Sequence, residues 1–268
     1  MDLKETWVVD DREQHRRVLD AFTRQAATFE DPRLNQAFTS WLPRLLAMAD
    51  PRGDDVCLDV AAGTSLVGRG LAARVACVVA LDATPAMLRE GRRHADAAGV
   101  RNLTFLLGDA ARLPCRTAAF SLVVTRFSLH HVSDPAGPLR EMVRVCRDGG
   151  RVIVQDLAAS TDPGVARRQD GLERLRDPSH VRMLPAGALR ERLEEAGMRV
   201  TAADTVTVER PVAQWLRQAL TEGDAAAAVV DQFERELAGG EPTGLRPSRR
   251  DGELWFEQTW ETTIAVKP

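Results

Sequence analysis

Small and acidic residues gather in a short loop whose chemistry suits a nucleotide-like ligand. The loop, Asp59-Val-Ala61-Ala-Gly63-Thr64-Ser65, joins an apolar run to a segment with helical spacing. Small residues allow a ligand to approach the backbone closely, and the N-terminus of the following helix presents free N–H groups. By itself this loop fits S-adenosylmethionine (SAM), a dinucleotide or a simple strand-to-helix turn.

Aspartates end the second and third apolar runs in a similar way. Asp82 closes VVALD, where its carboxylate could accept both hydroxyls of a ribose or, alternatively, cap the helix that begins near Pro85. Asp109 closes LLGD, where it could accept the exocyclic amino group of adenine beside the backbone of Ala110, or lie in a solvated turn. SAM and NAD both contain ribose and adenine, but a dinucleotide site does not require an acid at Asp109.

Two further groups of residues could act on an acceptor molecule. His130 and His131 follow the fourth apolar run, and histidine is a natural general base near neutral pH. The alternative is a loop histidine held by backbone hydrogen bonds. In RDPSHVR, Arg176 and His180 could orient an acceptor together with Asp177, or the Asp-Pro pair could simply form a turn. The two neighbouring histidines are therefore candidate catalytic residues, and Arg176 and His180 are candidate acceptor-binding residues.

The segments that carry these residues alternate between strand-like and helix-like patterns. Such alternation predicts βαβ units with a parallel sheet, and continuous apolar strands predict helices on both faces. Because ligands bind at the carboxyl ends of the strands in such sheets, the three loops and the histidines should lie together. The predicted strands are 56–61, 76–82, 103–109, 120–127 and 151–157, and the predicted helices between them are 66–74, 85–99 and 134–150, the last ending at two glycines.

The flanking segments are expected to form further helices and two more strands. Helical patterns cover 12–48, 185–197 and 211–238, and strand-like alternation covers 198–209 and 254–268. For the domain organisation we expect an N-terminal helical lid in residues 1–50 and a main domain in 51–268, with lid insertions near 160–183 and 211–244.

With these motifs in place, the sequence resembles the class I SAM-dependent methyltransferases, in the group related to the ubiquinone/menaquinone C-methyltransferases. The resemblance spans roughly residues 18–157 and rests on LDVAAGTS, VVALDATPAMLREGRRHA and the block from FLLGDAARLP through LHHVSDP to GGRVIVQDL. A weaker match continues through ERLRDPSHVRMLP (173–185). These motifs are specific for the fold and for SAM, but not for a substrate.

The resemblance implies a doubly wound, Rossmann-like α/β fold with a seven-stranded, mostly parallel sheet, an antiparallel last strand and helical lid segments. It implies that Ala61, Gly63 and Thr64 line the methionine part of SAM. One departure is Ser65, because the third small position of this loop is usually glycine in the family. If the backbone is left-handed there, a residue other than glycine costs about 1–2 kcal/mol.

The resemblance also assigns expected contacts to the rest of the cofactor. It implies that Asp82 binds the ribose, that Asp109 and Ala110 contact adenine, that Arg126 faces the sulfonium and that Phe29 covers the cofactor. The full set of expected cofactor contacts is Phe29, Asp59, Ala61, Gly63, Thr64, Ser65, Asp82, Ala83, Asp109, Ala110 and Arg126.

As function, the resemblance implies transfer of a methyl group from SAM to a small-molecule acceptor, such as a quinone-like compound or a specialised metabolite. Ser65 favours one alternative, a cyclase or isomerase that keeps SAM as a structural cofactor, because a shared fold does not fix the reaction. An NAD-dependent oxidoreductase and a non-enzymatic binding module are further alternatives. Asp109 argues against the first of these, and the largely intact cofactor loops argue against the second.

Bulk properties narrow the class of protein. A net charge of −3 over 268 residues gives no reason to expect nucleic acid as a partner. The four cysteines form no C-x-x-C pair and match no common zinc site, so we expect free thiols, a reducing compartment and no metal. The N-terminal segment has no apolar signal-peptide core, and no run approaches the roughly 18 apolar residues of a spanning helix. We expect a cytoplasmic monomer or homodimer.

Overall fold

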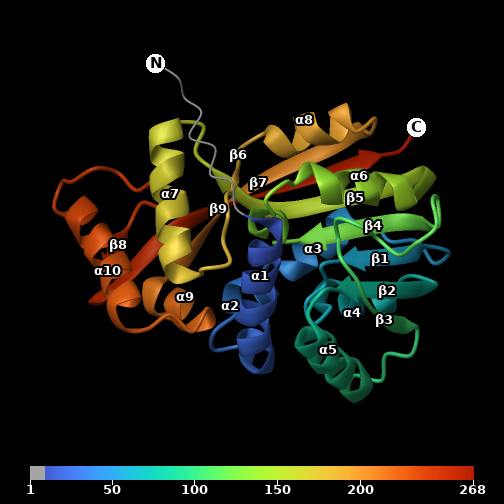
Figure 1. Cartoon of the computed structure of the whole chain (residues 1–268), viewed down its shortest axis with the longest axis horizontal. Helices are drawn as coiled ribbons and strands as arrows, with labels where there is room; N and C mark the ends of the chain where they lie inside the picture. Colours follow the sequence, from blue (N-terminus) through green and yellow to red (C-terminus); the bar gives the residue numbers. More distant parts are fainter. Residues whose placement is uncertain (1–9) are drawn as a thin grey trace.

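The apolar runs form the strands of one sheet in the computed structural model of the chain (Figure 1). The structure describes residues 10–268. Residues 1–9 lie outside the described part, and with them the start of the predicted lid and most of the segment checked for a signal peptide. Seven strands lie side by side in the order β3 (Leu103–Leu107), β2 (Cys77–Asp82), β1 (Val56–Val60), β4 (Phe120–Arg126), β5 (Cys146–Ala159), β9 (Glu253–Val266) and β7 (Arg199–Pro211).

The direction of the strands matches the prediction. Strands β1 to β5 are parallel, whereas β9 is antiparallel to both of its neighbours, β5 and β7. The predicted seven-stranded, mostly parallel sheet with an antiparallel last strand is therefore confirmed. Two short strands that were not predicted join it, β6 (Leu184–Pro185) beside β5 and β8 (Ser248–Arg250) beside β9. Both are too short to show the alternation that identifies a strand.

Helices cover both faces of the sheet, because successive strand residues point to opposite sides. Cys57 lies in a core that α3 and α4 complete, and its neighbour Leu58 lies in a second core that α6 and α8 complete. The layers are therefore those of a doubly wound fold. The bounds of these helices are α3 (Leu42–Met48), α4 (Leu66–Ala72), α6 (Ala136–Val145) and α8 (Ala188–Glu195).

The helix predicted over 134–150 is shorter in the structure, and its last part was predicted wrongly. Helix α6 ends at Val145, and residues 146–150 already belong to β5, which pairs with β4 on both sides of a register shift. Gly149 has a φ of +70°, and a Cβ on Gly150 would lie 2.7 Å from a backbone carbonyl oxygen. The two glycines therefore permit a bulge at the start of a strand instead of ending a helix.

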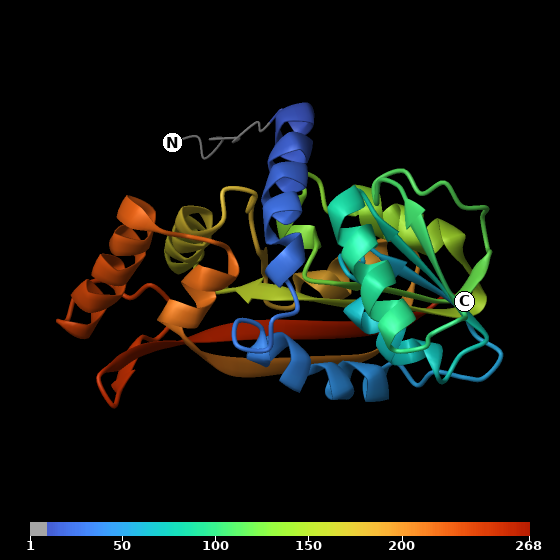
Figure 2. The same ribbon diagram turned by 90° about the horizontal axis from the view of Figure 1, so that it is seen from below.

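Strands β7 and β9, at one edge of the sheet, extend beyond the other strands. Strand β5 pairs with β9 only as far as Leu157 and Trp260, whereas β7 and β9 remain paired to Pro211 and Trp255. Figure 2 shows this β7–β9 ribbon running to the side of the molecule where three further helices lie. A separate core containing Trp215 packs these helices on the ribbon. They are α7 (Pro163–Arg176), α9 (Val212–Gln218) and α10 (Gly223–Leu237).

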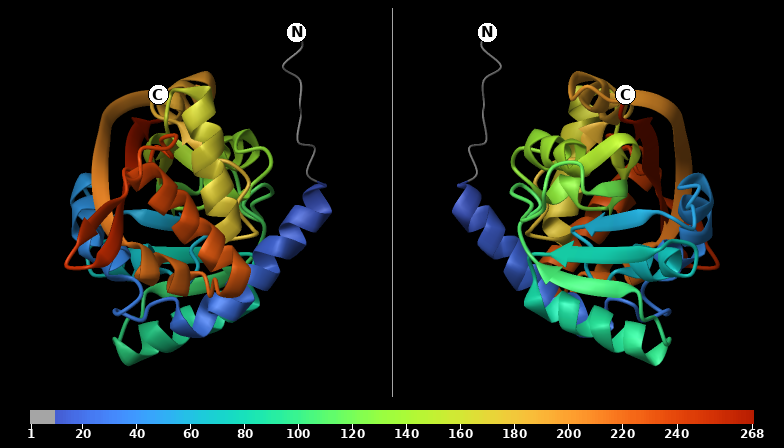
Figure 3. Two further views of the ribbon diagram at one scale, coloured as in Figure 1. Left: turned by 90° about the vertical axis from the view of Figure 1, so that its left-hand side faces the viewer. Right: turned by 90° about the vertical axis from the view of Figure 1, so that its right-hand side faces the viewer.

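Helix α1 lies near the carboxyl ends of the parallel strands. In Figure 3 the arrowheads of β1, β2 and β3 point toward α1. The division into lid and main domain stays a prediction. Within residues 10–268, no helix is long and apolar enough to cross a membrane. The remaining helical elements are α1 (Asp11–Gln25), η1 (Ala26–Thr28), α2 (Gln36–Ser40), α5 (Pro85–Ala97) and η2 (Leu129–His131).

Candidate functional site

A cavity of about 530 Å³ lies where the parallel strands end, between α1, the strand-end loops and the β7–β9 ribbon. Its size is that of a small-molecule binding site. Three predicted site residues, Thr64, Ser65 and His180, do not border it. The predicted residues that do border it are Phe29, Asp59, Ala61, Gly63, Asp82, Ala83, Asp109, Ala110, Arg126, His130, His131 and Arg176.

The loop after β1 is shaped by a buried aspartate. Asp59 Oδ2 accepts hydrogen bonds from Ser65 Oγ at 3.0 Å and from the backbone N–H of Gly68 at 2.9 Å. Burial raises the pKa of Asp59 to about 7, although these two hydrogen bonds oppose the rise. Ser65 has a φ of +57°, the left-handed backbone that glycine usually supplies. Its hydroxyl therefore points into the protein and holds the loop.

Thr64 of the same loop contacts two residues that the sequence analysis missed, Glu30 and Gly91. The Thr64 hydroxyl donates to the carboxylate of Glu30, which also binds Arg69. A Cβ on Gly91 in α5 would lie 2.6 Å from the carbonyl oxygen of Thr64. The loop thus contacts α5 backbone to backbone, and only glycine permits this approach. Because Glu30 and Gly91 lie far from the loop in sequence, no local pattern marked them.

We expect Gly91→Ala to destabilise the protein relative to Gly171→Ala, a helical glycine of α7 with open space around its Cβ. Both changes add the same intrinsic helix propensity, but only the first forces a Cβ against the loop backbone. The free energy of unfolding should differ between the variants by about 1–3 kcal/mol. Denaturant titration measures this difference, and equal stabilities would contradict the close approach.

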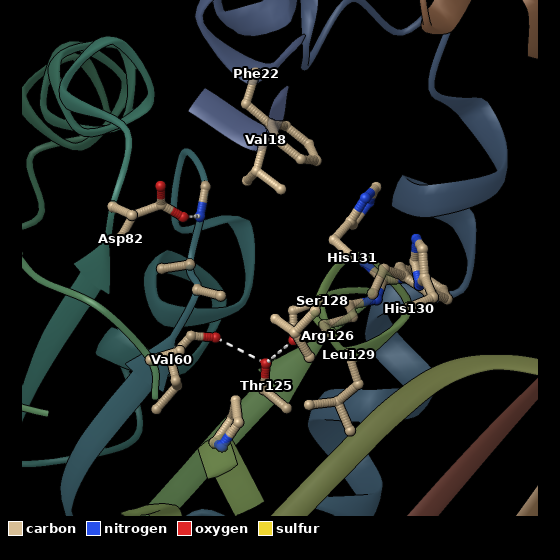
Figure 4. Close-up of a pocket in the computed structure, with 18 of the residues that line it drawn as sticks. Val18, Phe22, Val60, Asp82, Thr125, Arg126, Ser128, Leu129, His130 and His131 are labelled. Atoms are coloured by element: carbon tan, nitrogen blue, oxygen red, sulfur yellow. Dashed lines mark hydrogen bonds between the residues drawn. The ribbon is translucent and has the colours of Figure 1, made fainter. Parts of the chain in front are cut away.

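Asp82 connects the first loop to the start of α5, whose N-cap is Thr84 and not Asp82. Its Oδ2 accepts the N–H of Gly63 at 2.7 Å, and its Oδ1 accepts the N–H of Thr84, at the start of α5, at 2.7 Å. Burial raises the pKa of Asp82, against the effect of these hydrogen bonds. Asp109 accepts the N–H of Ala111 at 2.8 Å. Both acids border the cavity, and Figure 4 shows Asp82 on the side opposite the histidines.

His130 is held by an aspartate of β5 that the sequence analysis did not select. Its Nδ1 is hydrogen-bonded to Asp156 Oδ1, and Asp156 also accepts the N–H groups of Leu129 and Leu157 at 2.7 Å each. Burial disfavours the imidazolium, but the carboxylate of Asp156 outweighs it and raises the pKa of His130. Despite its burial, the pKa of Asp156 is lowered by His130 and by the backbone hydrogen bonds. The two residues form a buried, charge-complementary pair.

His131 and His180 both lie close to this pair, but only His131 borders the cavity. His131 Nδ1 lies 3.1 Å from the carbonyl oxygen of Ser179, and burial together with the neighbouring His130 lowers the pKa of His131 well below its usual range. His131 borders the cavity as a neutral ring. His180 Nε2 is bonded to Asp170 Oδ1 at 2.8 Å, and its ring lies 5.5 Å from that of His130. The predicted acceptor contact of His180 therefore has no support from its position.

Arg126 lies on the cavity wall among aromatic rings. Its Nε donates to Gln155 Oε1 at 2.7 Å, and a second nitrogen donates to the carbonyl oxygen of Phe38 at 2.9 Å. Its guanidinium carbon lies 4.8 Å from the ring centre of Phe127. Burial lowers the pKa of Arg126 to about 9, while the charge of Asp59 opposes this. These contacts fix the guanidinium at the end of β4, and the predicted position of Arg126 opposite the sulfonium stays a prediction.

Helix α1 and Phe29 form part of the cavity wall. A Cβ on Gly63 would lie 3.6 Å from the ring of Phe29, so this aromatic residue covers the first loop. Gln14 of α1 donates to the carbonyl oxygens of His131 at 2.8 Å and Ser179 at 2.6 Å. Phe22 packs edge-on against His131, at 5.0 Å between ring centres (Figure 4). These contacts attach α1 to the residues around the histidines.

Comparisons with known proteins agree with this fold and site. A family model described as a methyltransferase domain matches residues 58–154. YafE of Escherichia coli (strain K12), an uncharacterized protein, is 34% identical over 152 residues, which cover 57% of this chain and 73% of YafE. The uncharacterized methyltransferase YcgJ of Bacillus subtilis (strain 168) is 33% identical over 138 residues, 52% of this chain and 54% of YcgJ.

A further sequence relative and a solved structure are also similar to this chain. The demethylmenaquinone methyltransferase of Clavibacter sepedonicus is 35% identical over 142 residues, 53% of this chain and 57% of that protein. The chain thus spans about half the length of this relative and of YcgJ. The crystal structure of a proposed methyltransferase from Bacillus halodurans C-125 has a TM-score of 0.79 and 26% identity, covering 85% of this chain and 99% of that one.

The chain belongs to the class I SAM-dependent methyltransferases, a family of enzymes whose cofactor is SAM. The resemblance seen in the sequence is therefore confirmed. Among residues 10–268, no three His, Cys, Asp or Glu side chains are grouped so that they could hold a metal ion.

Proposed function

We propose that the protein transfers a methyl group from SAM to a small-molecule acceptor of the quinone-like or specialised-metabolite type. The observation that carries this proposal is one cavity bordered on one side by Asp82 and Asp109 and on the other by His130. A cofactor at the first side would share this cavity with an acceptor at the second. The name of the Clavibacter relative gives demethylmenaquinone as its substrate, which supports a cyclic acceptor here.

The residues of the cofactor side fit SAM. Each carboxylate oxygen of Asp82 accepts one backbone N–H and retains a lone pair, so the ribose hydroxyls can donate to them. Gly63 has a φ of +56°, and Phe29 lies over it, which leaves a backbone cradle under an aromatic cover. SAM supplies a methyl group that is already activated on its sulfonium, so the chain's own task is to bind and orient.

His130 is positioned to remove a proton from the acceptor. Because Nδ1 donates to Asp156, the lone pair of the neutral ring lies on Nε2. Within residues 10–268, Nε2 has no hydrogen-bond partner, and the ring borders the cavity. Asp156 keeps this tautomer and stabilises the imidazolium that forms when the proton is taken. An acceptor that needs deprotonation would therefore meet a base beside the methyl group.

No observation favours the alternative of a cyclase or isomerase on the same fold. Ser65, the residue that suggested it, adopts the left-handed backbone expected of glycine and donates to Asp59. The hydrogen bond offsets the cost of about 1–2 kcal/mol for this backbone. Because the side chain points away from the cavity, the loop presents the same backbone that glycine would present. The decisive experiment is incubation with SAM and demethylmenaquinone or simple phenols, with mass analysis for the gain of one methyl group.

We expect Asp82→Ala to weaken binding of S-adenosylhomocysteine about 10- to 100-fold. Loss of hydrogen bonds to a charged group costs about 1.5–3 kcal/mol, which corresponds to that change in affinity. Isothermal titration calorimetry measures it. The matched control is Asp96→Ala, an exposed aspartate of α5 outside the cavity, which should bind like the wild type. Unchanged affinity in Asp82→Ala would remove the ribose assignment.

A further inference from the structure

A buried arginine borders the same cavity on the side away from the cofactor loops. Arg210 lies near the end of β7, and both it and Gln258 of β9 line the cavity. In the sheet, β7 is three strands from β4, a lateral separation of roughly 14 Å at ordinary strand spacing. The cofactor loops follow β1, β2 and β3, on the other side of β4. His130, which follows β4, therefore lies between the cofactor side and Arg210.

The guanidinium of Arg210 has few partners for a group so deeply buried. The residue is 2% exposed, and its guanidinium carbon lies 5.5 Å from the ring centre of Phe38. It donates to Gln258 Oε1 at 3.1 Å and to Gln218 Oε1. These bonds use two of its five N–H donors. Within residues 10–268, its Nε has no acceptor and no carboxylate lies within 4.0 Å of it.

The nearby carboxylates are engaged by other groups. Glu173 accepts from Gln258 Nε2 at 2.6 Å and lies 3.6 Å from a guanidinium nitrogen of Arg176. Asp177 accepts the backbone N–H of Ser179 at 2.9 Å and its hydroxyl at 2.6 Å. Burial lowers the pKa of Arg210 to about 9, the charge of Arg176 acts in the same direction, and the more distant charge of Glu173 opposes them. The group therefore remains a cation at neutral pH without a direct counter-charge.

A buried cation of this kind is costly unless an anion joins it. Guanidinium groups bind carboxylates with short, often bidentate hydrogen bonds, so an anionic oxygen group is the natural partner. Arg210 is also pre-oriented, because two glutamines and an aromatic ring hold it against the cavity wall. The part of the cavity that leads to it includes the apolar side chains of Phe38, Phe127 and Leu157.

Resting on the proposed methyl transfer, we propose that the acceptor carries a carboxylate or similar anionic oxygen group that binds Arg210. The atom that receives the methyl group then lies beside His130, and an apolar body spans the distance between them. Gln218 and Gln258 act as positioning residues for the guanidinium. Arg176, predicted as an acceptor contact, also borders the cavity and donates to Gln218 Oε1 at 3.2 Å, so it helps to hold this glutamine in place.

The test uses acids and neutral amides of the same shape, bound to the protein saturated with S-adenosylhomocysteine. The probes are phenylacetate, 3-phenylpropionate and 4-phenylbutyrate with their primary amides, titrated by calorimetry. At least one acid should bind roughly 10- to 100-fold more tightly than its amide, the range expected for a hydrogen-bonded charge. Arg210→Gln should abolish this preference, and Arg210→Lys should retain part of it. Arg250→Gln, an exposed arginine that pairs with Glu209, is the control and should bind like the wild type.

Two results would overturn the proposal. One is that no acid binds better than its amide, including the case in which none binds at all. The other is an acid preference that persists in Arg210→Gln. Thermal unfolding and S-adenosylhomocysteine affinity of each variant show whether it is folded with an intact cofactor side. Failure of the proposed function would appear separately, because the wild type would then not bind S-adenosylhomocysteine. The ratio of acid to amide affinity can still be measured in that case, since the titrations can be run without cofactor.

Discussion

Replacing His130 with alanine is expected to lower the turnover number about 10²- to 10⁴-fold, the usual contribution of a general base. Affinity for SAM should stay nearly unchanged, because His130 is not among the predicted cofactor contacts and the predicted ribose and adenine contacts follow β2 and β3. The wild-type rate should rise with pH, since only the neutral ring accepts a proton. Because the pKa of His130 is raised, this rise should be centred above the ordinary histidine value of 6.5.

Single-turnover kinetics with a methyl-accepting substrate measure this effect where chemistry limits the rate. His131→Ala should have a milder effect, because Nδ1 of that ring is engaged with Ser179 and its low pKa keeps it neutral. His94→Ala, on α5 and outside the cavity, should be silent. Equal turnover of His130→Ala and wild type would exclude the base while leaving methyl transfer intact, because an acceptor that is already nucleophilic needs only positioning.

The strand-end residues were predictable from sequence because a parallel sheet brings its carboxyl ends to one edge. That rule selected Asp82, Asp109 and His130 from three separate segments, and all three border one cavity. It did not select Asp156, because this residue lies inside the run RVIVQDL (151–157) and β5 continues beyond it to Ala159. The sequence analysis treated that run only as a strand, and so it found the histidine without its partner.

The acceptor side could not be predicted in this way. Arg210 lies on a strand that continues beyond the common edge, so its place depends on how far β7 and β9 stay paired. Its partner Gln218 also donates to Asn35, 183 positions earlier, and no local pattern reports such a contact. The loop residue Ser65 shows a second reason why the sequence alone did not predict the site fully. The sequence raised a left-handed backbone there only as a condition, and the hydrogen bond to Asp59 that offsets its cost appears only in the folded chain.

Asp156→Asn is expected to lower the rate about 10²- to 10⁴-fold, as loss of the carboxylate in a catalytic histidine–aspartate pair generally does. The amide NH₂ of asparagine would donate to Nδ1 and place the ring proton on Nε2, the atom that must accept one. The pH dependence should change as well. Burial lowers the pKa of His130 and Asp156 provides the main opposing effect, so its removal should shift the rise in rate to lower pH.

The matched control for this variant is Asp170→Asn. Asp170 is likewise a buried partner of a histidine, with His180 Nε2 at 2.8 Å, but His180 does not border the cavity. This change should lower stability without moving the pH profile, since it alters a similar pair beside the reacting groups but not in contact with them. A pH–rate profile that shifts equally in both variants would mean that Asp156 acts only by holding the fold. A shift confined to Asp156→Asn assigns it to the protonation of His130.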